Sequence, residues 1–326
     1  MTEETFSLES SPYASVRVRV MQTLLIPAEE YQKLLKMSLP EISNYLGETE
    51  YQSEIRDMGV RYSGIELIEM ALNSNYDATI QKLHRISPPS YNKMIDLYLA
   101  RNDAENIKTI LRGVIAGLNP DDIRKMLFPS VLLSSVGDLM KKKSKEEILA
   151  ALPMPFKGIP PGSLFEMENA IDRAYFSFSL KSLKKVPEQG ILFRQFLFEI
   201  MEAINIMTVL RLLREEVEDK EKYLFYNRTP LLRRLMAARS LSDAQRILSE
   251  SPYKIESTDT LIPFEISLYR QIYARTLHFQ HQDPFSVYVV LGYLFAKEME
   301  IRNVRKIVQS KHLGILPEEV EAQLVI

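Results

Sequence analysis

The stretch "AENIKTILRGVIAGLNPDDIRKML", Ala104–Leu127, decides the fold, because "IRNVRKIVQSKHLGILPEEVEAQL" at Ile301–Leu324 repeats its pattern 197 residues later. The coincident pairs are Asn106 and Asn303, Ile107 and Val304, Ile110 and Ile307, Leu111 and Val308, Gly117 and Gly314, and Pro120 and Pro317. Apolar residues three and four apart predict an amphipathic helix, and the glycine and proline predict a turn into a second helix. We call the first helix of this pattern the marker helix.

A third marker helix lies between these two. It is predicted in "EAINIMTVLRLLR", Glu202–Arg214, where Asn205 lies 99 residues after Asn106 and 98 residues before Asn303. A fainter fourth copy opens the chain with "SVRVRVMQTLLIPAEEYQKLL" from Ser15. Its alternating start could also be a strand, but its place in the repeat favours a helix. Four marker helices therefore bracket three units of about a hundred residues each.

The repeat predicts an all-α protein with three similar helical modules, at residues 1–105, 106–204 and 205–326. A period near a hundred residues exceeds the 20 to 50 residues that are typical of solenoid repeats, so each unit is a small helical domain. Three such modules can form a curved row or a closed, ring-like body with approximate threefold symmetry. We favour the closed body, because a marker helix both opens and ends the chain.

Each full marker helix carries a recurring asparagine followed by apolar residues. The asparagine lies at the edge of the apolar stripe, where a half-buried amide fixes the packing register if it finds partners and is costly if it does not. We therefore interpret the asparagines as structural, with a ligand-binding role as the alternative. The markers of the repeat are Asn106, Asn205, Asn303, Leu111, Leu210 and Val308.

Helix ends and loops have their own signals. A serine followed three residues later by glutamate predicts a capping box, which occurs at Ser38 with Glu41 and at Ser144 with Glu147. Four prolines and two glycines in Pro153–Ser163 predict a loop. The charged run Arg214–Lys222 predicts a solvated helical turn or two.

Composition excludes several classes of protein. The 326 residues hold 41 basic and 43 acidic side chains, so no basic surplus favours a nucleic-acid partner. The absence of cysteine excludes disulfides and thiolate metal sites, and it favours a reducing compartment. The acidic N-terminus has no pattern of a secretory signal, and no uncharged stretch approaches the roughly 20 residues of a membrane span.

Catalytic signatures are missing as well. No phosphate-binding loop, dinucleotide turn or nucleophile elbow occurs, so we expect neither catalytic residues nor a cofactor. His278 and His281 have the only metal-like spacing, but no nearby set of ligands completes a site, and we expect no metal. An arginine-rich stretch is either a docking surface for an acidic partner or an ordinary amphipathic face, and its arginines are Arg228, Arg233, Arg234 and Arg239.

The order of these motifs resembles one known family. The opening "YASVRVRV", then "LPEISNYLGETEY", "NIKTILRG" and the closing "NVRKIVQSKHLGILPEEV" are similar to the C subunit of archaeal A-type and bacterial V-type ATP synthases, a relative of the d subunit in eukaryotic vacuolar ATPases. The resemblance covers essentially the whole chain. Two departures from the internal pattern are Gln309, where an arginine is expected, and the charged segment after the third marker helix, which replaces the glycine and proline turn.

The resemblance implies an all-helical, funnel-shaped rotor protein without an active site of its own. Such a protein links the central shaft, formed by the D and F subunits, to the proteolipid c-ring and transmits torque between them. It also implies a peripheral position at the cytoplasmic face of the membrane. A free-standing helical scaffold for other partners is the alternative function, and an enzyme that uses His278 and His281 is a third.

Overall fold

The structure is a computed structural model that describes residues 11–130, 136–183, 188–217, 219–225, 229–253 and 261–325. The predicted all-α class is confirmed, because the described residues form helices and no strand. The shorter helices are α1 (Pro12–Gln22), α2 (Ala28–Leu34), α3 (Leu39–Leu46), α4 (Gln52–Met58), α7 (Pro120–Lys125), α8 (Val136–Met140), α9 (Lys145–Ala151), α12 (Pro230–Met236), α13 (Leu241–Ser249), α16 (Pro317–Glu321) and the 3-10 turn Glu221–Tyr223.

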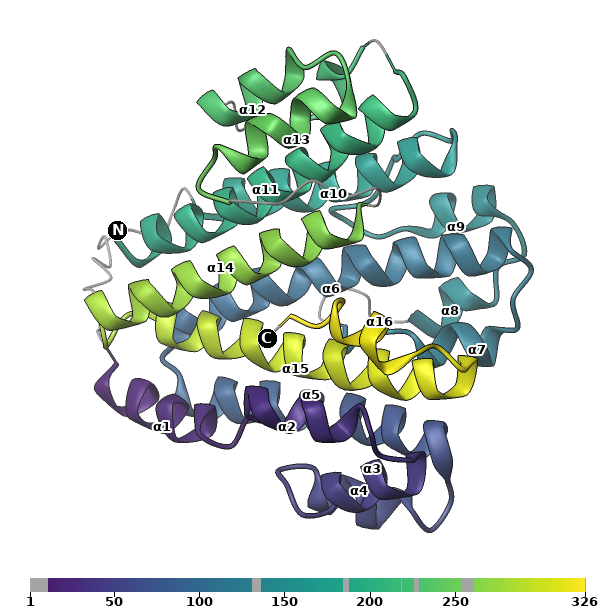
Figure 1. Cartoon of the computed structure of the whole chain (residues 1–326), viewed down its shortest axis with the longest axis vertical. Helices are drawn as coiled ribbons and strands as arrows, with labels where there is room; N and C mark the ends of the chain where they lie inside the picture. The colour runs from purple at the N-terminus through teal and green to yellow at the C-terminus, as the bar shows by residue number, and fades with distance from the viewer. Residues whose placement is uncertain are drawn as a thin grey trace, which may run out of the picture.

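Six long helices form the body of the molecule (Figure 1). Three of them are the full marker helices, which are 27 residues long and begin 99 residues apart: α6 (Pro89–Ile115), α11 (Glu188–Arg214) and α15 (Val287–Leu313). The fainter fourth copy is the shorter helix α1. Each full marker helix follows another long helix along the chain, and these are α5 (Gly64–Ile86), α10 (Leu164–Ser182) and α14 (Ile262–Gln282). The repeat of the sequence is therefore a repeated pair of long helices.

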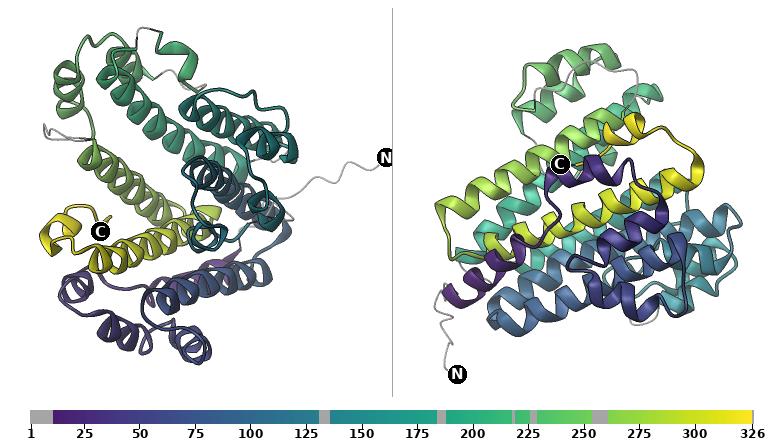
Figure 2. Two further views of the ribbon diagram at one scale, coloured as in Figure 1. Left: turned by 90° about the vertical axis from the view of Figure 1, so that its right-hand side faces the viewer. Right: turned by 60° about the horizontal axis from the view of Figure 1, so that its bottom comes forward.

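Helix α15 lies at the centre of the molecule. It packs against α1, α5, α6, α11 and α14, and the whole run from Val287 to Ile301 is buried. Figure 2 shows the surrounding helices from two further directions. A helix that is covered on all sides cannot keep its charged residues in water, so Lys297, Glu298 and Glu300 need partners within the protein.

The alternating segment near the N-terminus is a helix, as the repeat predicted. Ser15 to Val20 lies within α1, where Ala14, Val18 and Met21 are buried and Val16 is exposed. The buried residues follow helical rather than strand spacing, because α1 lies against α15 and α5 with one face only.

The predicted module boundaries at residues 105/106 and 204/205 fall inside α6 and α11. Each marker helix is continuous across its boundary, so the boundary residues define a register and not a linker. The division into residues 1–105, 106–204 and 205–326 stays a prediction. The loop predicted at Pro153–Ser163 is confirmed, since it joins α9 to α10 without helical structure.

One capping box is confirmed and one differs from the prediction. At the start of α3, the carboxylate of Glu41 accepts a hydrogen bond from Ser38 N at 2.7 Å. At the start of α9, Ser144 Oγ accepts from Glu147 N at 3.2 Å, but the Glu147 carboxylate accepts from Lys143 N and not from Ser144 N. The side chain of Glu147 therefore satisfies an amide one residue farther from the helix.

All three marker helices end in the same left-handed turn. The residue at the turn has a positive φ in each case, at Gly117 (69°), Gly314 (67°) and Glu216 (54°). The following amide donates to the carbonyl five residues earlier, in the pairs Leu118 N to Gly113 O (2.9 Å), Ile315 N to Ser310 O (3.0 Å) and Val217 N to Leu212 O (2.9 Å). The prediction of a solvated helical turn within Arg214–Lys222 is confirmed at the 3-10 turn Glu221–Tyr223, where Glu221 and Lys222 are exposed, while α11 itself ends at Arg214.

Replacing Glu216 with glycine is expected to stabilise the protein by about 1 kcal/mol, because the left-handed conformation costs a residue with Cβ roughly that much. The exposed Glu216 side chain makes no contact that offsets this cost among the residues described. The midpoint of urea unfolding measures the change. Gly314→Ala is the matched control and should destabilise by about the same amount. No gain from Glu216→Gly would show that the turn is not strained.

The recurring asparagines join each marker helix to the chain about 20 residues farther on. Asn106 donates to Phe128 O at 2.8 Å and accepts from Phe128 N at 2.9 Å. Asn303 makes the same two bonds with Val325, at 2.8 and 2.9 Å. Asn205 makes one, accepting from Phe225 N at 2.8 Å. Each side chain thereby satisfies backbone groups that no regular element pairs.

Asn106→Ala is expected to destabilise the protein by about 2 to 4 kcal/mol, because it leaves both a donor and an acceptor of Phe128 without a partner. Asn205→Ala should cost less, about 1 to 2 kcal/mol. Only one bond is lost there, and the buried Asn205 amide nitrogen already lacks a partner among the described residues. Denaturant unfolding of both variants measures the two losses in the free energy of unfolding. Equal losses would show that the second hydrogen bond of Asn106 adds nothing to stability.

Candidate functional site

Among the described residues, a hollow of about 310 Å³ lies between five of the long helices, α6, α10, α11, α14 and α15. The C-terminal halves of α6 and α11 and the N-terminal halves of α10 and α14 form its walls. The hollow therefore lies toward the end of the molecule where the marker helices end, on the right in Figure 1.

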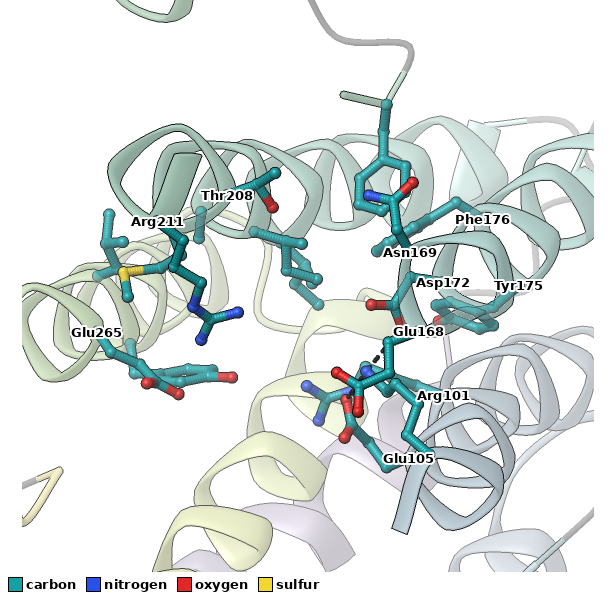
Figure 3. Close-up of a pocket in the computed structure, with 18 of the residues that line it drawn as sticks. Arg101, Glu105, Glu168, Asn169, Asp172, Tyr175, Phe176, Thr208, Arg211 and Glu265 are labelled. Carbon is teal, nitrogen blue, oxygen red and sulfur yellow. Dashed lines mark hydrogen bonds and ion pairs between the residues drawn. The ribbon is translucent and has the colours of Figure 1, made fainter. Parts of the chain in front are cut away.

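The lining is rich in charge. Arg101, Lys108, Arg112, Arg211 and Arg302 provide five cations, and Glu105, Glu168, Asp172 and Glu265 provide four carboxylates. Figure 3 shows most of these side chains around the open space. Because opposite charges are nearly balanced, the hollow does not have the character of a simple anion or cation site.

The deepest charges form a closed network around Glu298, which is fully buried. Arg101 pairs with one of its carboxylate oxygens, Tyr98 donates to the same oxygen at 2.7 Å, and Arg302 lies 2.8 Å from the other. Burial alone would raise the pKa of Glu298, but Arg101 and Arg302 outweigh it and hold the pKa below its usual value. Glu298 is therefore a permanent carboxylate that ties α15 to α6.

A second cluster forms the wall between α6 and α10. Lys108 Nζ lies 2.8 Å from both Glu105 Oε1 and Asp172 Oδ1. Burial would lower the pKa of Lys108, but the two carboxylates raise it above its usual value. Nearer the mouth, Arg112 Nε lies 2.6 Å from Glu168 Oε1. These partners hold the side chains in fixed positions, so this wall is rigid and its charges are satisfied.

The opposite wall is different, because its charges are not paired. Arg211 on α11 is exposed, and Glu265 on α14 is half-buried. Neither side chain makes an ion pair or a hydrogen bond with another residue in the part of the chain that is described. Figure 3 shows both side chains directed toward the hollow.

The other predicted marker residues are fully buried. Leu111, Leu210 and Val308 have no exposed surface. Each lies on its marker helix five residues after the recurring asparagine. None of the six marker residues lines the hollow, although Asn303 lies at a neighbouring depression between α14 and α15. The equivalence of the three sets in space stays a prediction.

Three of the predicted docking arginines, Arg233, Arg234 and Arg239, do not line the hollow. Arg233 on α12 and Arg239 after it are exposed, while Arg234 pairs with Glu250 at 2.9 Å. Arg228 lies outside the described residues. Their role in docking stays a prediction.

His278 and His281 both lie near the C-terminal end of α14, and His281 is exposed. The described residues hold no group of three or more histidine, cysteine, aspartate or glutamate side chains that could bind a metal ion. Nor does any helix in the described ranges have the length and apolar character that crossing a membrane requires.

Sequence reasoning did not find the charged lining. One signal was present, since Lys297, Glu298 and Glu300 follow the apolar run "VYVVLGYLF" within the same buried helix. Charged residues on the apolar face of a helix predict buried ion pairs. Their partners, such as Arg101, lie too far away in the sequence to be found from spacing alone.

The described residues form an all-helical protein with repeated long helices around a charged hollow. The family described as the ATP synthase (C/AC39) subunit matches residues 14–323, and the chain belongs to this family. The C subunit of the A-type ATP synthase of Haloquadratum walsbyi is 31% identical over 96% of this chain and 97% of its own length. The C subunit of Haloferax volcanii is 30% identical over 96% of this chain and 97% of its own length. The C subunit of Methanococcoides burtonii is 29% identical over 99% of this chain and 96% of its own length.

Proposed function

We propose that the chain is the non-catalytic central-stalk C subunit of an A-type rotary ATP synthase. In this role it is a socket that links the central shaft, formed by the D and F subunits, to the proteolipid c-ring. Family membership over residues 14–323 supports the assignment to the complex. The observation that carries the socket role is the hollow of about 310 Å³ between five long helices, toward one end of the body.

We propose that the long helices form three modules around a pseudo-threefold axis. Arg101 and Glu298 are 197 residues apart, as the marker asparagines Asn106 and Asn303 are, and they form an ion pair. Ile200 has the corresponding position on α11 and lines the same hollow. Residues at equivalent positions of three helices come together only near a common axis, and this supports the closed, funnel-like arrangement.

We place the shaft at the hollow and the c-ring at the opposite end of the body. That end includes the turn between α5 and α6 and the turn between α14 and α15, which are joined by a hydrogen bond from Tyr91 Oη to Phe285 O at 2.7 Å. A ring contact made by many copies of one loop favours polar, tolerant contacts over shape-specific ones. The protein then has a peripheral position at the cytoplasmic face of the membrane.

Co-purification from the native host tests the proposed function. Tagged protein should bring down the D and F subunits of the shaft together with the proteolipid. Raising the salt concentration should release the proteolipid before the shaft, because screening weakens exposed polar contacts first. Recovery of the tagged protein without either partner would contradict the rotor assignment and favour a free-standing scaffold.

A further inference from the structure

The unpaired charges of the hollow occupy positions that are paired elsewhere in the repeat. Arg112, Arg211 and Gln309 have equivalent positions on the three marker helices, and Glu168, Glu265 and Glu69 have equivalent positions on the preceding long helices. Arg112 pairs with Glu168 at 2.6 Å, and Gln309 donates to Glu69 at 3.0 Å. Only the pair of Arg211 and Glu265 is open among these described residues.

The open pair is not explained by other partners within the protein. Lys306 lies within electrostatic range of Glu265, but its ammonium group donates a hydrogen bond to Gln323 O at 2.7 Å. Arg211 has five N–H donors and a side chain of the same length as Arg112, which does reach its glutamate. Arg211 on α11 and Glu265 on α14 therefore lie on the same side of the hollow and face its open space (Figure 3).

We propose that Arg211 and Glu265 are a docking key, which binds one carboxylate and one cation on the tip of the central shaft. This inference rests on the proposed function. A partner that enters the hollow removes water from both side chains, and a charge that loses water without gaining an opposite charge is strongly unfavourable. Charge-assisted bonds from the planar Arg211 guanidinium to a carboxylate satisfy this need with defined geometry.

The key also selects one orientation of the shaft. A socket with three equivalent modules offers a partner three similar orientations, but a protein that transmits torque requires a single one. Because the equivalent positions at Arg112 and Gln309 are already paired, the third module alone offers an open pair at this position among the described residues. Electrostatic complementarity gives this kind of specificity, since wrong orientations place unpaired charges together.

The affinity of the whole chain for a purified complex of the D and F subunits tests the docking key. Arg211→Ala and Glu265→Ala are each expected to weaken binding at least tenfold. Arg56→Ala removes an exposed cation of α4 that does not line the hollow and is the matched control, expected to stay within threefold of wild type. Circular dichroism verifies that each variant is folded, and Arg211→Lys should keep part of the affinity because it keeps the charge.

A charge swap separates docking from internal attraction. In the double variant Arg211→Glu with Glu265→Arg, the hollow keeps its net charge but presents the reversed pattern to the shaft. The docking key predicts that binding falls at least as far as in the single variants, whereas restored binding would show that the two residues act only on each other. If the wild-type chain binds the complex and the affinity of Arg211→Ala stays within threefold of it, the docking key alone is overturned. No binding by the wild-type chain would overturn the proposed function and the key together.

Discussion

Replacing Glu298 with alanine is expected to destabilise the protein by about 3 to 5 kcal/mol, the usual cost of breaking a buried ion pair from one side. The carboxylate has no exposed surface and holds Arg101, Arg302 and Tyr98. Its removal leaves the buried guanidinium of Arg101 without an opposite charge. The free energy of urea unfolding, followed by circular dichroism, measures the loss.

A double variant shows whether the charge itself or the packing is needed. Glu298→Leu with Arg101→Met removes both charges and keeps the volume, so it should recover most of the stability lost in Glu298→Ala. Arg302 also loses Glu298 in this variant, but its side chain is 32% exposed, so water can still reach it. If Glu298→Ala unfolded like the wild type, Glu298 would not be the link between α15 and α6 that the structure shows.

The second large effect is expected at the apolar markers. Leu111→Ala and Leu210→Ala should each destabilise by about 2 to 5 kcal/mol, because both side chains are fully buried and each substitution leaves a cavity. The two sites are 99 residues apart and have the same place on their marker helices. Similar costs at both sites, measured by denaturant unfolding, would support equivalent packing of α6 and α11.

An exposed apolar residue on the same helix is the control for this pair. Ile115 at the end of α6 is 50% exposed, and Ile115→Ala should change stability by at most about 0.5 kcal/mol. Costs near zero at both Leu111 and Leu210 would mean that the repeat aligns surface positions and not core positions.

Periodicity and register predicted the parts of the fold that local sequence determines. The asparagine, glycine and proline of the first pattern correspond to a backbone clamp at Asn106, a left-handed turn at Gly117 and the first residue of α7 at Pro120. Each of these residues has a strong local preference, so its role can be recognised without neighbours in space.

Local patterns could not predict the turn at Glu216 or the charged hollow. Glutamate has no preference for a positive φ, and only the hydrogen bond from Val217 N to Leu212 O shows that α11 ends as the other marker helices do. The hollow is lined by Arg101, Lys108 and other charges, which no short sequence pattern groups together. Their pairing depends on contacts between helices far apart in the sequence.

Site-specific cross-linking in the assembled complex tests the socket most directly. The chain contains no cysteine, so a single introduced cysteine carries a photoreactive probe without removal of others. Ile204→Cys places the probe on the wall of the hollow, and Val60→Cys places it on the outside, where Val60 is 85% exposed. We expect the probe at position 204 to cross-link to the shaft and the probe at position 60 not to do so. Cross-links to the shaft from position 60 and none from position 204 would contradict the socket.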